Sequence, residues 1–245
     1  MYQQEEEWFS TWFNSPYSHI LHKNHDVQEA HAFIDKLIAH LQTKLTYQLL
    51  ELGCGTGQHA AYLNQKGFAV TGLDFSDENI TRANQFTNER LYFYQHDMRD
   101  IFRTAYYDLI LNLFTRFGYF NTETENVVAL RSTVAAIKPG GKLVIDFMNT
   151  NQALQQVTGN EEKTIDGVLF QISRKVEKGF IVKTISVTDQ GQQHTFFEKV
   201  RALTYDQFLE YFRMTSLRLV NVFGSYDLAP YHPETSKRMI FILKK

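Results

Sequence analysis

Cysteine and long apolar runs are scarce in this 245-residue sequence, which argues against a secreted or membrane protein. Cys54 is the only cysteine, so a disulfide within the chain is excluded and a reducing compartment is favoured. No apolar run approaches the length of a membrane-spanning helix. The acidic residues 5–7 differ from the basic start of a signal peptide. We therefore expect a cytoplasmic protein that has no membrane partner.

Charge and histidine spacing argue against two further kinds of site. The net charge is −2 and the sequence has no long basic run, so electrostatics does not indicate a nucleic-acid partner. None of the nine histidines forms an H-x-x-x-H pair or clusters with other ligand residues, so we expect no metal site. The chain is 43% hydrophobic and long enough for one large α/β domain with a small subdomain.

Strand and helix patterns alternate between residues 47 and 146, which predicts a parallel, doubly wound sheet. The strand patterns lie at residues 47–52, 68–73, 91–95, 107–113 and 142–148, with helix patterns between them. Three helices are expected to begin with a capping box, in which two side chains satisfy free backbone N–H groups. The three pairs are Asp26 with Glu29, Thr122 with Glu125 and Thr204 with Gln207. The second helix is expected to end at a Lys-Pro-Gly-Gly turn, residues 138–141.

The pattern changes after Asn151. Residues 163–201 contain three or four strand patterns separated by short turns, which favour antiparallel hairpins. We expect an inserted antiparallel β-meander, followed by a helix and two last strands. The predicted division is an N-terminal arm and helix at 1–46, a sheet domain at 47–150 and 204–245, and the inserted subdomain at 151–203.

A glycine-rich turn follows the first strand pattern. The strand leads into Glu51 and then into Gly53, Gly55 and Gly57, and a helix pattern begins directly afterwards. This arrangement brings bare backbone close to a small ligand, since each glycine lacks the Cβ that would block the ligand or the turn. The spacing G-x-G-x-G lacks the last glycine of a dinucleotide fingerprint. Glu51 would repel a pyrophosphate and attract a cation.

The segment ELGCGTG, residues 51–57, resembles motif I of the class I S-adenosylmethionine (SAM) methyltransferases, whose ligand carries a sulfonium and an ammonium group. The resemblance covers residues 47–147 and 204–245. It implies a Rossmann-like, seven-stranded, mostly parallel sheet with an antiparallel last strand, and SAM as the cofactor. It also implies that the ligand lies over the turn formed by Glu51 and the three glycines.

Further cofactor contacts are expected where later strands end. Asp74 lies 17 residues beyond Gly57 and could accept hydrogen bonds from both ribose hydroxyls. In similar methyltransferases, an aspartate at the position of Asp97 meets the adenine amino group, and Met98 could cover the ring. We assign two further strand-end residues to the same site, Phe75 and Leu113.

The fourth strand pattern leads into a stretch that ends with Arg116-Phe117-Gly118-Tyr119. It resembles the F-x-x-x-G-[HY] stretch of small-molecule methyltransferases, including those that act on nucleotide-linked amino sugars. The resemblance implies that acceptor and sulfonium meet here. With an unperturbed pKa near ~10, Tyr119 is a poor base at neutral pH but could orient a nucleophile. Arg116 could face an anionic substrate group, or it could be an exposed loop arginine.

The aromatic arm before the first long helix has two possible roles. In similar enzymes such an arm folds over the ligand, with aromatic and basic side chains near the methionine carboxylate. On that interpretation Tyr17 and Lys23 belong to the cofactor site. The alternative is that the arm only seals a hydrophobic edge. The meander likewise could roof the pocket or form the surface of a homodimer.

The sequence therefore predicts an enzyme that transfers a methyl group from SAM to a nitrogen or oxygen of a small molecule. One alternative is a non-catalytic SAM-binding regulator or partner subunit, which the cofactor motifs do not exclude. The other is an NAD-linked oxidoreductase, which the missing glycine, Glu51 and the expected antiparallel ending disfavour. The acceptor and the methylated atom cannot be read from the sequence.

Overall fold

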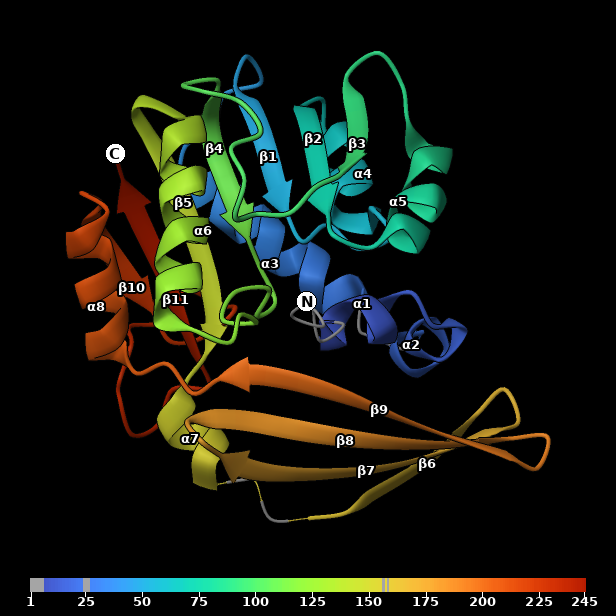
Figure 1. The fold of residues 1–245 in the computed structure, drawn as a ribbon. Coiled ribbons are helices and arrows are strands. Elements are labelled where there is room, and N and C mark those ends of the chain that lie inside the picture. Colours follow the sequence, from blue (N-terminus) through green and yellow to red (C-terminus); the bar gives the residue numbers. More distant parts are fainter. Residues whose placement is uncertain (1–6, 24–26, 156, 158) are drawn as a thin grey trace, which may run out of the picture.

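The computed structural model describes residues 7–23, 27–155, 157 and 159–245. It contains a large sheet covered by helices and a second, smaller sheet below it (Figure 1). The first segments of the chain are helical, with the bounds α1 (Trp8–Phe13), α2 (Pro16–His22) and α3 (Val27–His40). The sequence predicts a helix start at Asp26, which lies outside the described residues. No helix in the described part of the chain is long and apolar enough to cross a membrane.

The large sheet has the strand order β10-β11-β5-β4-β1-β2-β3. The strands β1 to β5 pair with one another in parallel, and β11 runs antiparallel to both β5 and β10. This confirms the predicted Rossmann-like sheet and its antiparallel ending. The strands are β1 (Gln48–Leu52), β2 (Ala69–Asp74), β3 (Leu91–Gln95), β4 (Tyr107–Asn112), β5 (Ile137–Met148), β10 (Arg218–Phe223) and β11 (Arg238–Lys244).

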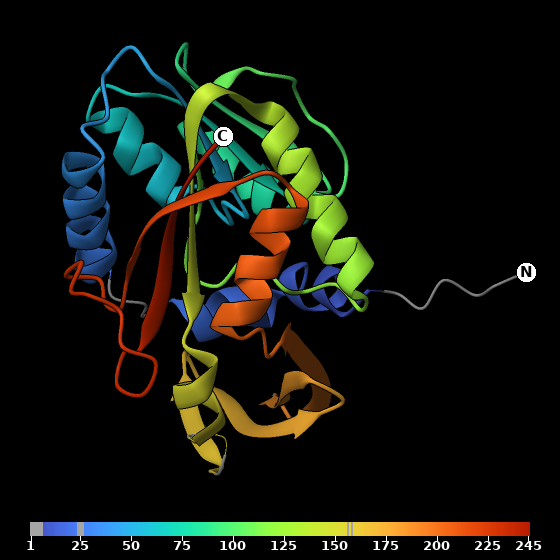
Figure 2. The ribbon, with the colours of Figure 1, turned by 90° about the vertical axis from the view of Figure 1, so that its left-hand side faces the viewer.

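Helices cover both faces of this sheet, because successive strand residues point to opposite faces (Figure 2). Leu50 packs toward α6 and α8, whereas Leu49 packs toward α3, α4 and α5. The bounds of the remaining helices are α4 (Gln58–Gln65), α5 (Asp77–Ala83), the 3₁₀ helix η1 (Asn84–Phe86), α6 (Glu123–Ala136), α7 (Thr150–Gln155) and α8 (Tyr205–Met214). The predicted capping boxes at the starts of α6 and α8 are both formed.

One local prediction is right only in part, since α6 ends at Ala136, close to the predicted stop, and another is wrong. Residues 138–141 do not separate α6 from the next strand as a turn, because β5 already begins at Ile137, which pairs with Tyr107. The ladder is irregular there, between Tyr107 and Leu109. A helix is also absent between β3 and β4, where residues 96–106 form only turns and irregular backbone. This open segment leaves the end of β3 free to line a pocket.

The smaller sheet is the predicted meander, with four antiparallel strands in sequence order. Each two-residue hairpin turn has both residues in the left-handed region, as the tight turns of hairpins require. Lys178 and Gly179, with φ of 51° and 79°, are one such pair. The strands are β6 (Glu161–Ile165), β7 (Val168–Glu177), β8 (Phe180–Asp189) and β9 (Gln192–Arg201).

The arm lies between the two sheets and shares a hydrophobic core with the meander (Figure 1). Trp12 and Leu21 supply the arm's side of that core. The Trp12 Nε1–H donates to Glu198 Oε1 of β9 at 2.8 Å, so this fully buried side chain is also fixed by a hydrogen bond. The meander's inward residues in this core are Val168, Phe170, Ile172, Ile185 and Val187.

Candidate functional site

The glycine turn lies at the carboxyl end of β1 and has the backbone that the sequence predicts. Gly53, Gly55 and Gly57 all have positive φ, of 70°, 54° and 80°. Glycine adopts this conformation without the strain that other residues incur. A Cβ on Gly57 would lie 2.8 Å from the Phe93 ring, whereas a Cβ on Gly55 would meet nothing within 4 Å. The turn is therefore packed at Gly57 and open at Gly55.

Asp74 fixes this turn from the end of β2. The Gly55 N–H donates to Asp74 Oδ2 at 2.8 Å, and the Ser76 N–H and Asn79 Nδ2 each donate to Oδ1 at 3.0 Å. Ser76 is the N-cap of α5, so Asp74 does not have that role. A carboxylate oxygen can accept more than one hydrogen bond, which leaves capacity for a ligand hydroxyl.

Glu51 places a buried carboxylate beneath the same turn. Only 3% of the residue is exposed. Its Oε1 lies 3.4 Å from His59 Nδ1, but its Oε2 has no hydrogen-bond partner among the described residues. A buried oxygen without a donor is unfavourable, and a cationic donor would remove that cost. The site therefore fits a ligand that brings an ammonium group to Glu51.

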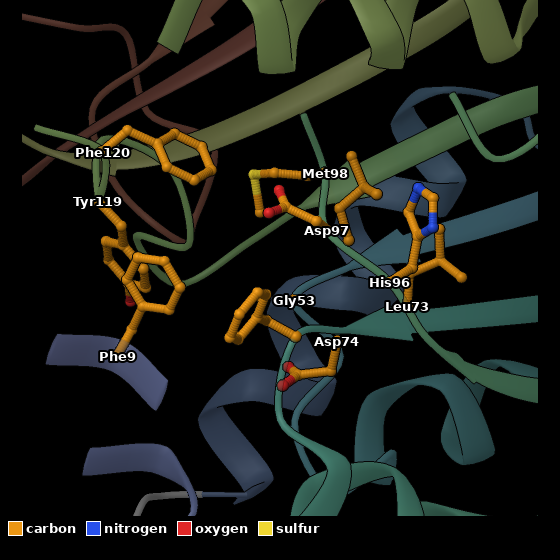
Figure 3. A pocket seen from close by; sticks show the side chains of 11 residues that line it. Phe9, Gly53, Leu73, Asp74, His96, Asp97, Met98, Tyr119 and Phe120 are labelled. Carbon is orange, nitrogen blue, oxygen red and sulfur yellow. The ribbon is translucent and has the colours of Figure 1, made fainter. Parts of the chain in front are cut away.

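A cavity opens beside the turn and is lined from five segments of the chain (Figure 3). Most of the wall is apolar, and the carboxylates of Asp74 and Asp97 line it from two different strand ends. An apolar slot with two acceptors suits a nucleoside, whose base is flat and whose ribose carries donors. The lining residues are Phe9, Leu52, Gly53, Leu73, Asp74, Phe75, His96, Asp97, Met98, Tyr119 and Phe120.

Asp97 shares its carboxylate with Arg99. The Arg99 Nε donates to Asp97 Oδ1 at 3.1 Å and to Oδ2 at 3.0 Å. The same guanidinium donates to Glu7 Oε1 at 2.8 Å and to Glu125 Oε1 at 3.0 Å. These bonds raise the pKa of Arg99, with Asp97 as the largest cause. An adenine amino group would therefore share Asp97 with Arg99.

Tyr119 closes one end of the cavity. Its ring contacts Trp8 edge-on at 5.0 Å and stacks with Phe13 at 6.1 Å between centroids. Burial raises the pKa of the Tyr119 phenol, and the neighbouring Arg116 opposes that shift. The phenol therefore keeps its proton at neutral pH. It can position a ligand by a hydrogen bond, but it is not a base.

The turn that leads to Tyr119 is held by a buried ion pair that sequence analysis did not single out. Phe114 and Thr115 both have φ of 60°, which is strained for residues with side chains. The Phe114 N–H donates to Asp146 Oδ2 at 2.7 Å, and Arg238 Nε donates to Asp146 Oδ1 at 2.7 Å. Arg238 Nη2 also donates to Thr115 Oγ1 at 2.9 Å. The sequence did contain a signal for this pair, because Asp146 interrupts an otherwise apolar strand. In the structure its side chain is fully buried.

Six predicted cofactor residues do not line the cavity: Glu51, Gly55 and Gly57 belong to the strand end and turn beside it, whereas Tyr17, Lys23 and Leu113 have other surroundings. The Tyr17 hydroxyl donates to Asp189 of the meander at 3.3 Å, and Lys23 pairs with Asp166 at 2.7 Å. Leu113 is 2% exposed and belongs to the core beneath α3, α4 and α5. The arm reaches the cavity through Phe9 of α1 instead, because its helical form turns α2 toward the meander. Among the described residues, no three His, Cys, Asp or Glu side chains are grouped to hold a metal ion.

Replacing Gly55 with alanine tests whether the open side of the turn faces the ligand. We expect the SAM affinity to fall about tenfold, because the new methyl group would occupy the ligand's space. Gly140 is a matched control, since it also has positive φ, of 79°, and a Cβ there would meet nothing within 4 Å. Both variants should lose about 1–2 kcal/mol of folding stability. Calorimetric titration that shows equal SAM affinity for the two variants would assign the turn a purely structural role.

Comparisons with known proteins agree with this geometry. Residues 49–141 match the family model described as a methyltransferase domain. The Bacillus subtilis protein YqeM, described as a methyltransferase, is 30% identical over 129 residues, which cover 50% of this chain and 51% of that protein. The chain thus spans about half the length of that relative.

Two further matches extend over more of the chain. The dTDP-3-amino-3,4,6-trideoxy-alpha-D-glucopyranose N,N-dimethyltransferase of Streptomyces venezuelae is 24% identical over 168 residues, covering 66% of this chain and 70% of that protein. The solved structure of a SAM-dependent methyltransferase from Clostridium acetobutylicum has a TM-score of 0.78 at 18% identity. That match covers 93% of this chain and 95% of the other. The predicted methyltransferase fold is confirmed, and residues 49–141 match the methyltransferase-domain model.

Proposed function

We propose that this chain, whose residues 49–141 match the model of a methyltransferase domain, transfers a methyl group from SAM to a nitrogen or oxygen of a small molecule. The cavity at the glycine turn is the observation that carries the proposal. Asp74 and Asp97 line its apolar slot, and next to the lining residue Leu52 stands Glu51, whose buried Oε2 has no partner among the described residues. These features match the ammonium, ribose and adenine of SAM.

The protein's own contribution is mainly alignment. The glycine turn and Asp74 would hold the ribose, Glu51 the ammonium group, and Asp97 with Met98 the base. When bound, SAM supplies an electrophilic methyl group, and holding a nucleophile in line with it provides much of the rate.

An amine is the favoured acceptor. Tyr119 remains protonated at neutral pH, so it cannot take the proton of an alcohol. A neutral amine brings its own lone pair and needs no base for the attack. The Streptomyces venezuelae relative is named as an N,N-dimethyltransferase of an amino sugar, which supports this choice.

The first experiment is calorimetric titration with SAM and with NADH, followed by a screen of amine and alcohol metabolites for release of S-adenosylhomocysteine. Binding of SAM with turnover of an acceptor supports the proposal. Binding of SAM without turnover of any acceptor, also with cell extract added, would favour the non-catalytic regulator. Binding of NADH alone would favour the oxidoreductase.

Replacing Tyr119 with phenylalanine should lower the rate of methyl transfer about tenfold and leave the SAM affinity unchanged, because one positioning hydrogen bond is lost. The variant and the wild type should share one pH profile between about pH 6 and about pH 9, since the phenol does not ionise there. A rate equal to that of the wild type would remove Tyr119 from the reaction. A loss above about 100-fold with an altered pH profile would identify it as a base.

The proposal includes a cytoplasmic location and a homodimer. The side of the meander away from the arm exposes about half of Phe197 and would provide the dimer surface. Light scattering of the purified chain would measure the oligomeric state.

A further inference from the structure

Arg116 lies directly on the glycine turn. A Cβ on Gly53 would be 2.8 Å from the Cβ and 3.0 Å from the Cγ of Arg116, so the arginine stem covers that glycine. The guanidinium carbon is 5.5 Å from the centroid of the Phe13 ring in the arm. Tyr119 is its largest electrostatic partner and lies within hydrogen-bonding reach. The cation is therefore held between the glycine turn, the arm and the end of the cavity.

Within the described part of the chain, this cation has no carboxylate partner of its own. Among the described residues, no acidic oxygen lies within 4.0 Å of Arg116. The carboxylates that act on it from further away are Asp74 and Glu198. Asp74 is already bonded to the glycine turn and α5, and Glu198 accepts from Trp12 at 2.8 Å and from Lys183 at 3.0 Å. A guanidinium in such a position suits an anion that a ligand brings.

A carboxylate, that of Glu51, lies at the same turn. The Oε2 of Glu51 is buried without a hydrogen bond among the described residues. The charges of Glu51 and Arg116 both act on the thiol of Cys54, which lies between Gly53 and Gly55. Burial raises its pKa, Asp74 and Glu51 raise it further, and Arg116 lowers it. One carboxylate oxygen without a donor and one guanidinium without a carboxylate, among the described residues, thus lie about the same short stretch of backbone.

We propose that Arg116 binds the carboxylate of SAM, while Glu51 binds its ammonium group, so that the two residues together recognise a zwitterionic α-amino acid. The assignment rests on the proposed function. It replaces Lys23, whose exposed ammonium pairs with Asp166 on the meander, as the group that meets the methionine carboxylate. It also moves Arg116 from the acceptor to the cofactor.

The test compares SAM with decarboxylated SAM, which keeps the ammonium and the nucleoside but lacks the carboxylate. In calorimetric titrations the wild type should prefer SAM by about 10- to 30-fold, as expected for a charge-assisted hydrogen bond. Arg116→Gln should lose this preference through weaker binding of SAM, with the affinity for decarboxylated SAM unchanged. Arg116→Lys should keep part of the preference, because a lysine offers charge without the planar fork.

Two controls separate the possible outcomes. Arg131→Gln removes an exposed arginine of α6 and should leave the preference unchanged, whereas Lys23→Gln tests the rival residue. A preference that survives in Arg116→Gln, or that disappears in Lys23→Gln, would overturn the assignment while the proposed function stands. A wild type that binds neither compound would overturn both. Arg116→Lys retains the stem over Gly53, so it serves as the test if Arg116→Gln does not fold.

Discussion

Asp74→Ala is expected to weaken SAM binding by about 30- to 150-fold, which corresponds to about 2–3 kcal/mol. The carboxylate is a wall of the cavity and also the acceptor for the Gly55 N–H. Its loss therefore removes a charge-assisted contact to the ribose and releases the turn that lies beneath the ligand. Isothermal titration of the purified variant measures the effect.

Asp108→Ala is the matched control for this variant. Asp108 lies at the start of β4, at the opposite edge of the sheet, and its Oδ2 accepts the Gln48 N–H at 2.8 Å. Both substitutions remove a carboxylate that accepts a backbone N–H at a strand end. The two variants should lose folding stability alike, but only Asp74→Ala should lose affinity for SAM. Equal affinities would show that Asp74 acts on the fold alone.

The largest loss of stability is expected from Asp146→Ala, at about 3–5 kcal/mol in the free energy of unfolding. The substitution leaves Arg238 buried without its partner and leaves the Phe114 N–H without an acceptor. It also releases the strained turn at Phe114 and Thr115. Urea denaturation followed by fluorescence measures the stability. Variants that still fold should transfer methyl groups more slowly, because this turn leads to Tyr119.

A double-mutant cycle with Arg238→Ala shows whether the two residues act together. The double variant should be more stable than the sum of the single losses predicts, by about 1–3 kcal/mol, because neither residue then leaves an unpaired charge behind. Strictly additive losses would mean that the pair does not hold the turn as a unit.

The sequence predicts the large sheet and the glycine turn well, for a local reason. Apolar periodicity marks each strand, and the capping boxes at Thr122 and Thr204 lie within four consecutive residues. The positive φ of Gly53, Gly55 and Gly57 follows from residue type. Asp74 and Asp97 could be placed because parallel strands bring their carboxyl ends to one edge of the sheet.

The remaining features depend on partners far away in the sequence. Asp146 meets Arg238 across 92 residues, and Tyr17 meets Asp189 across 172 residues. No local pattern distinguishes an arm that covers a ligand from one whose second helix faces the meander. Residues 96–106 show the opposite case, where a helix is expected from the alternation but the chain crosses directly from β3 to β4.

The shared core of arm and meander bears on how proteins of this kind can diversify. Trp12 is fully buried and bonded to Glu198, so neither segment can be exchanged by recombination without exposing the surface of the other. Phe9 and Phe13 on the same helix reach the cavity wall and Tyr119. A lineage that gains a new acceptor through the meander must therefore alter its first 22 residues as well. Comparative sequence sets should show arm and meander changing together while the glycine turn stays constant.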